Sequence, residues 1–111
     1  MHEVSVMMSI LDIAIEEAQK AKASKIIGVR LNIGERSGVE VEALKFAFDT
    51  VTRNSIAENA VLSIALIPFK GECLSCGNQF ESTDYMVCDK CGGFAKVISG
   101  QELQIESLEV E

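Results

Sequence analysis

Two cysteine motifs constrain the fold of this chain more than any other feature of its sequence. Each has two residues between its cysteines and a glycine directly after the second one: Cys73-Leu74-Ser75-Cys76-Gly77 and Cys88-Asp89-Lys90-Cys91-Gly92. This spacing lets both thiolates of a motif turn toward one ion, and the glycine can adopt the positive φ that the tight turn needs. Four thiolates form a closed tetrahedral shell, which is typical of structural zinc and leaves no position for a substrate water. We therefore expect Cys73, Cys76, Cys88 and Cys91 to bind a stabilising Zn²⁺ ion.

Disulfide bonds and a rubredoxin-type iron site are the other roles open to four cysteines, since tetrahedral sulfur also suits iron. Disulfides are disfavoured because Glu3 and Asp12 occupy the region where a secretory signal would be basic, so the chain is expected to stay in the reducing cytoplasm. The apolar run over residues 60–69 is too short to cross a membrane. The sequence thus predicts a cytoplasmic protein in which zinc is the resident metal.

The segment 71–100 is predicted to be a separate zinc-binding module. It contains all four cysteines and five of the eight glycines of the chain. Its few large apolar residues are too few to fold thirty residues without a metal cross-link. We expect this zinc-ribbon-like module to be inserted into a domain formed by residues 1–70 and 101–111.

Two helices are predicted from apolar residues that recur every three or four positions. The first runs from Val4 to Lys22 and the second over residues 40–53. Each is followed by a segment with the alternating pattern of a strand, over residues 25–33 and 61–69.

The last eleven residues, 101–111, predict a third strand whose alternation slips once near Ser107, as at a β-bulge. The expected architecture is an α+β fold in which two helices pack on one face of a three-stranded antiparallel or mixed sheet.

Charge and motif content exclude several functional classes. The net charge of −7 repels a phosphate backbone, so nucleic-acid binding is disfavoured. The chain has a single histidine, no Ser/His/Asp set and no phosphate-binding glycine loop, so we do not expect it to be an enzyme. Any nucleotide hydrolysis has to come from a partner.

The amino terminus, Met1-His2-Glu3, places the only histidine beside the terminal amine. We expect the initiator methionine to be retained, because histidine is too bulky for its usual removal. The amine, the amide nitrogen of His2 and its imidazole Nδ1 can then close adjacent chelate rings on one metal, and nickel or copper favours such nitrogen donors. Glu3 could complete the shell through its carboxylate or its amide nitrogen. The alternative is that His2 is an ordinary solvated side chain.

Taken together, these motifs resemble the HypA/HybF family of nickel-insertion accessory proteins of nickel–iron hydrogenase maturation. The resemblance extends over essentially the whole chain. It rests on Met1-His2-Glu3, the segments 33–39, 43–48 and 99–103, and both cysteine motifs. One departure is Asp89, since many relatives carry proline after the first cysteine of the second motif.

The resemblance implies a nickel metallochaperone that delivers Ni²⁺ to the hydrogenase large subunit and works with a nickel-handling GTPase of the HypB type. It assigns nickel to Met1, His2 and Glu3, with Glu40 as a further candidate ligand near the second helix, and zinc to the four cysteines. Some relatives also support urease maturation, so urease accessory proteins are further candidate partners. We expect a monomer or a weak homodimer.

Two other functions fit parts of the sequence. A zinc-ribbon adaptor acting only through protein contacts would leave the amino terminus without a metal role. A small redox enzyme using the cysteine thiols would expose reactive thiols, although the even pairing of the four cysteines argues against it.

Overall fold

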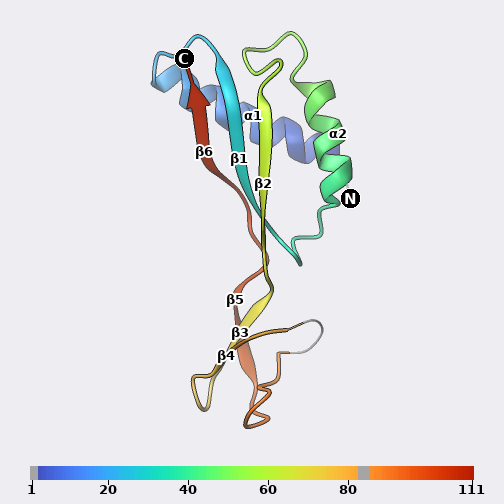
Figure 1. The fold of residues 1–111 in the computed structure, drawn as a ribbon, viewed down its shortest axis with the longest axis vertical. Coiled ribbons are helices and arrows are strands. Elements are labelled where there is room, and N and C mark those ends of the chain that lie inside the picture. The colour runs from blue at the N-terminus through green and yellow to red at the C-terminus, as the bar shows by residue number, and fades with distance from the viewer. Residues whose placement is uncertain (1–2, 83–85) are drawn as a thin grey trace.

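The computed structural model describes residues 3–82 and 86–111, which form an elongated molecule of 54 × 27 × 17 Å. Two helices and one three-stranded sheet occupy one end, and a second three-stranded sheet occupies the other (Figure 1). The elements follow in the order α1 (Glu3–Lys20), β1 (Ile26–Gly34), α2 (Val41–Val51), β2 (Val61–Ile67), β3 (Lys70–Cys73), β4 (Gln79–Glu81), β5 (Ala95–Ser99) and β6 (Leu103–Val110). The predicted α+β class is confirmed.

The first sheet has the strand order β2-β1-β6, with β1 parallel to β2 and antiparallel to β6. It is therefore the mixed form of the predicted sheet. Parallel neighbours need a crossover connection, and α2 supplies it between β1 and β2. Figure 1 shows α1 crossing behind the strands and α2 lying on the β2 side.

The core lies between the two helices and the central strand. Its fully buried large side chains come from α1, β1 and α2: Met7, Ile26, Leu31, Ile33 and Leu44. The first helix ends two residues earlier than predicted because Lys22 adopts a left-handed conformation with φ of 57°, which a helix cannot continue through.

Irregular pairing explains where the strand patterns depart from strict alternation. Arg30 pairs with Ser107 and Leu31 with Ile105, so Glu106 is an extra residue, and the predicted bulge near Ser107 is confirmed. A second shift between Ile26 and Gly28 makes Ile26 the fully buried residue, whereas Ile27, which the alternating pattern selects, is only half-buried.

The second sheet has the strand order β4-β3-β5. The sequence pattern predicts a zinc module in this region but does not predict its individual strands. The apolar pattern over residues 61–69 predicts one strand, with Pro68 at its end or at an edge position, and the structure confirms it as β2, which ends at Ile67 before β3 starts at Lys70. Pro68 lies between them and cannot donate a ladder hydrogen bond. The Ser99 hydroxyl donates to the Pro68 carbonyl oxygen at 2.8 Å, which holds the two connections between the sheets together.

Backbone contacts fix the junction of the two sheets. The Gly34 N–H donates to the Glu102 carbonyl oxygen at 2.8 Å, and the Arg36 N–H donates to the Gly100 carbonyl oxygen at 2.7 Å. A Cβ atom on Gly34 would lie 2.1 Å from the Gly100 carbonyl carbon, so only glycine permits this approach.

Two carboxylates complete the junction. Glu35 accepts the Phe69 N–H at 2.8 Å, and Glu102 accepts the Gly100 N–H at 2.8 Å. The Arg36 guanidinium lies 5.1 Å from the centre of the Phe69 ring. The two sequence segments 33–39 and 99–103 therefore meet in space, and they set the position of the second sheet relative to the first.

Within the described residues, no helix is long and apolar enough to span a bilayer.

Candidate metal centre

The four cysteines meet at the end of the second sheet. All four sulfur atoms lie within 4.8 Å of one another, with Cys73 and Cys91 Sγ 3.4 Å apart and Cys76 and Cys88 Sγ 3.7 Å apart. Four sulfurs bound to zinc at about 2.3 Å in a tetrahedron are about 3.8 Å apart, so the cluster fits this ion. A disulfide needs sulfurs at about 2.05 Å, and all four cysteines are free thiols.

Each motif folds as a turn that aims backbone N–H groups at its first sulfur. Cys73 Sγ accepts the N–H groups of Ser75 and Cys76, both at 3.4 Å. The turn closes with the Gly77 N–H donating to the Cys73 carbonyl oxygen at 3.0 Å, and Gly77 has φ of 76°. The positive φ predicted for the glycine after the motif is confirmed.

The second motif repeats this arrangement. Cys88 Sγ accepts the Lys90 N–H at 3.4 Å and the Cys91 N–H at 3.5 Å, and Gly92 has φ of 75°. In both motifs the first cysteine is buried and the second is exposed. The cluster therefore has one protected side and one side open to solvent.

These contacts give the sulfurs unequal pKa values. The N–H groups of Cys91 and Lys90 lower the pKa of Cys88 to about 6. The pKa of Cys73 is also lowered, and the hydrogen bond from the Cys76 N–H is the largest cause. The Gly93 N–H lowers the pKa of Cys91, but the other three sulfurs together raise it to about 12. Without a cation the cluster cannot hold four thiolates, so metal binding must release protons.

One residue of the centre that sequence reasoning missed is Asn78, directly after the first motif. Its side-chain amide donates to Cys88 Sγ at 3.6 Å and to the Asp89 carboxylate at 2.8 Å. Asp89 therefore anchors the second turn to the first. An amide side chain beside a metal-binding turn is a weak signal, because only folding brings Asn78 to the second motif.

Replacing Asn78 by alanine is expected to weaken zinc binding by about tenfold, as loss of groups that orient ligands commonly does. The change removes a donor to the thiolate and so raises the pKa of Cys88. Folding lowers this pKa from 9.0, so the resulting stabilisation is fully present above pH 9.0 and is lost as the pH falls through about 6. The variant should release zinc at a higher pH than the parent protein.

Zinc retained against a chelator, measured over a pH series, checks this expectation. Gln79→Ala is the matched control, because the neighbouring Gln79 amide donates to Glu72 at 3.0 Å and to no sulfur. Equal zinc retention in both variants would contradict the role of Asn78.

Of the predicted nickel residues, Met1 and His2 lie outside the described residues, and Glu3 begins α1. The Glu3 carboxylate accepts the Glu40 N–H at 3.2 Å. Glu40 is the N-cap residue of α2 and makes no side-chain cap of its own. The contact thus joins the starts of the two helices and brings two of the candidate nickel residues together, although they are far apart in sequence.

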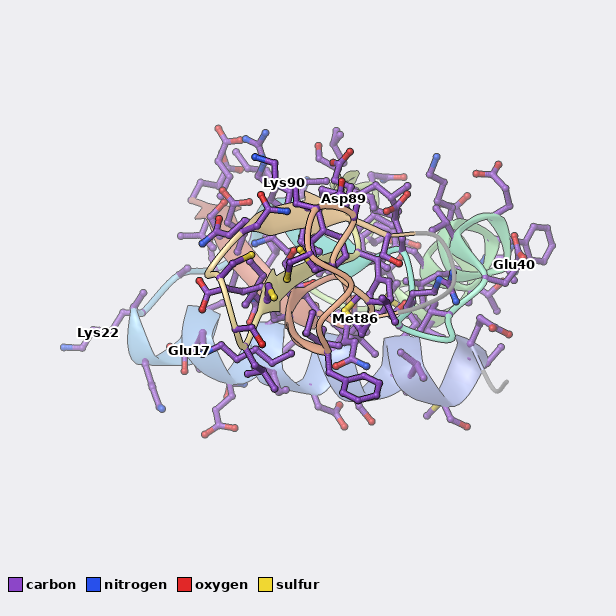
Figure 2. The ribbon with its side chains drawn as sticks, turned by 90° about the horizontal axis from the view of Figure 1, so that it is seen from below. Glu17, Lys22, Glu40, Met86, Asp89 and Lys90 are labelled. Atoms are coloured by element: carbon purple, nitrogen blue, oxygen red, sulfur yellow. The ribbon has the colours of Figure 1, made fainter. Side chains whose placement is uncertain are left out.

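The Glu3 carboxylate lies on the helical part of the chain, away from the second sheet and the two cysteine turns. Figure 2, viewed from below, shows Glu40 at the outer side of the molecule, whereas Asp89 and Lys90 of the second cysteine motif lie nearer the middle. Figure 1 likewise shows the starts of α1 and α2 at one end of the molecule and the second sheet at the other, so Glu3 and Glu40 lie apart from the sulfur cluster.

Comparison of the sequence with known proteins identifies relatives over its full length. The profile of a family described as "Hydrogenase/urease nickel incorporation, metallochaperone, hypA" matches residues 1–110. The hydrogenase maturation factor HypA of Caldanaerobacter subterraneus subsp. tengcongensis is 42% identical over 114 aligned positions, covering 100% of both chains. The hydrogenase maturation factor HypA of Chlorobaculum parvum is 41% identical over 113 positions, again covering both chains completely.

Solved structures show the same fold. The solution structure of the Ni metallochaperone HypA from Helicobacter pylori has a TM-score of 0.73 at 34% identity and covers 99% of this chain and 97% of its own. A second solution structure of a HypA protein has a TM-score of 0.76 at 35% identity, with coverage of 100% and 97%.

Proposed function

Because the chain belongs to the HypA family of nickel-incorporation metallochaperones, we propose that it carries Ni²⁺ at its amino terminus and delivers it during maturation of nickel–iron hydrogenase. Proteins of this family are maturation factors rather than enzymes. The observation that carries the proposal is the full-length match, which includes the segment Met1-His2-Glu3.

The geometry supports two metal sites with different roles, one for a structural ion and one for a transferable ion. All four cysteines are used in one cluster that fits zinc, so a transferable ion needs other ligands. The amine, His2 and Glu3 offer nitrogen and oxygen donors, which suit nickel. Glu40 is the further candidate, since its N–H binds the Glu3 carboxylate. Residues 1–70 and 101–111 would thus form the nickel-binding domain, and residues 71–100 the zinc module.

The proposal includes partner proteins and a cellular location. Delivery of nickel needs a recipient, for which we propose the hydrogenase large subunit, with a HypB-like GTPase as the nickel-handling partner. The family description also names urease, so urease accessory proteins are a second group of candidate partners. Four free thiols in one metal cluster suit a reducing compartment, and the proposed location is the cytoplasm.

His2→Ala tests the proposal directly. We expect the untagged variant to lose its nickel site while it keeps its zinc and its fold, because it lacks the imidazole donor and retains all four cysteines. Nickel titration followed by absorption, with metal content measured in parallel, gives both readings. Ser5→Ala is the control, since Ser5 is an exposed neighbour on α1 whose hydroxyl is not in any of the proposed ligand sets.

Unchanged nickel binding in His2→Ala would overturn the amino-terminal site. Zinc binding without any nickel binding in the parent protein would instead leave the zinc-ribbon adaptor as the function.

A further inference from the structure

Strand β6 forms an open edge of the first sheet. The strand order β2-β1-β6 leaves β6 paired on one side only among the described residues, and Figure 1 shows its outer side uncovered by a strand. Alternate residues of an edge strand direct their N–H and C=O groups outward, where another extended segment can pair with them.

An apolar groove of about 420 Å³ runs beside this edge, between β6 and α1. Its apolar lining comes from α1, the residue directly after it, and β6: Ile13, Ala18, Ala21, Ile105, Leu108 and Val110. The two alanines leave the space open because their side chains are short. Ile13 is 54% exposed although it is a large apolar residue. A strand added beside β6 would place alternate side chains in this groove.

The charges around the groove select the kind of segment that fits. Strand β6 carries Glu106 and Glu109, is flanked by Glu102 and Glu111, and has no basic residue. Glu17 is the charged residue of the groove lining. Two of these carboxylates already pair with cations, since Lys20 lies 3.4 Å from Glu17 and Arg30 lies 3.8 Å from Glu106. Glu109 and Glu111 have no ion pair among the described residues, although Lys25 lies beside Glu111 and its N–H donates to the Glu111 carbonyl oxygen at 3.2 Å. The negative charge that can attract a basic segment therefore centres on Glu109.

We infer that the β6 edge and its groove bind an extended basic segment of a partner protein, which pairs as an added strand and places apolar side chains against Ile13 and Leu108. A second copy of this chain is a poorer fit, because two paired β6 strands would each carry two glutamates and no basic residue. The inference does not depend on nickel binding.

A synthetic strand peptide tests the inference: acetyl-Lys-Val-Lys-Ile-Lys-Val-Lys-amide. We expect it to shift the backbone amide signals of residues 103–110 and 13–21 in NMR titrations of the zinc-loaded protein. Two control peptides should bind at least about tenfold more weakly. One carries Glu in place of Lys and is repelled by the acidic edge. The other carries Ser in place of Val and Ile and has no apolar side chain to bury in the groove.

The chain offers a matched pair of variants on α1. Ile13 and Met8 are both 54% exposed, but only Ile13 lines the groove. Ile13→Gln is expected to weaken binding of the basic peptide about tenfold, and Met8→Gln to leave it unchanged.

Three results would overturn the inference. The first is no binding of the basic peptide, or shifts confined to another face. The second is equal weakening by the two variants, which would indicate attraction to the net charge alone. The third is concentration-dependent broadening of the residue 103–110 signals in the protein without peptide, which would show that a second copy occupies the edge.

Discussion

Removal of the zinc ion, or replacement of Cys73 by serine, is expected to unfold residues 71–100 while the two helices and the first sheet remain folded. Among the described residues of this segment, Cys73 and Cys88 are the only buried residues apart from two glycines, and they are 3% and 4% exposed. Of the large apolar residues, Phe80 and Met86 are only half-buried beside Gly71, and Phe94 has 78% of its area exposed.

The metal therefore replaces the core in this part of the chain. Structural zinc contributes about 10–16 kcal/mol to the folding of zinc-finger peptides, far more than a few half-buried side chains. The helical part has its own core around Leu31 and Leu44, both 0% exposed, so it does not need the metal.

Zinc content and amide NMR spectra of the chelated protein and of Cys73→Ser provide the measurement. Signals of residues 71–100 should collapse to unfolded positions, and those of α1 and α2 should stay dispersed. Ser75→Ala is the control, because the Ser75 backbone N–H that binds Cys73 Sγ is retained. A zinc-free protein with a dispersed spectrum for residues 71–100 would contradict the expectation.

Gly34→Ala is expected to destabilise the protein by roughly 3 kcal/mol or more, at the upper end of what overpacking costs. The new Cβ atom would lie 2.1 Å from the carbonyl carbon and 2.2 Å from the carbonyl oxygen of Gly100, and backbone cannot move aside as a flexible side chain can. Relief of this overlap would separate β1 from the junction and break the hydrogen bond from Arg36 to Gly100.

Chemical denaturation monitored by circular dichroism measures this loss. Gly28→Ala is the matched control on the same strand, since the nearest atoms to its Cβ are the Cβ and Oε2 of Glu109 at 3.3 Å, and the cost should be about 1 kcal/mol or less. Similar losses in the two variants would show that the close approach at Gly34 is not the cause.

The sequence alone was sufficient for the elements that local chemistry specifies. Apolar spacing located both helices and the strands of the first sheet, because a helix and a half-buried strand impose different periods on the residues that face the core. The cysteine spacing located the metal ligands for a similar reason: two residues between cysteines are enough to aim both sulfurs at one ion.

Tertiary structure decided the features that depend on residues far apart in the chain. The register shift between β1 and β6 buries Ile26 in place of Ile27. The two cysteine turns come together only in the folded chain, which brings the Asn78 amide to Cys88 Sγ. The approach of Gly34 to Gly100 and the bond between Glu3 and Glu40 were likewise set by folding. The spacing of apolar residues indicates which face of a helix or strand is buried. It does not indicate which other element packs against that face, because that depends on how the whole chain folds.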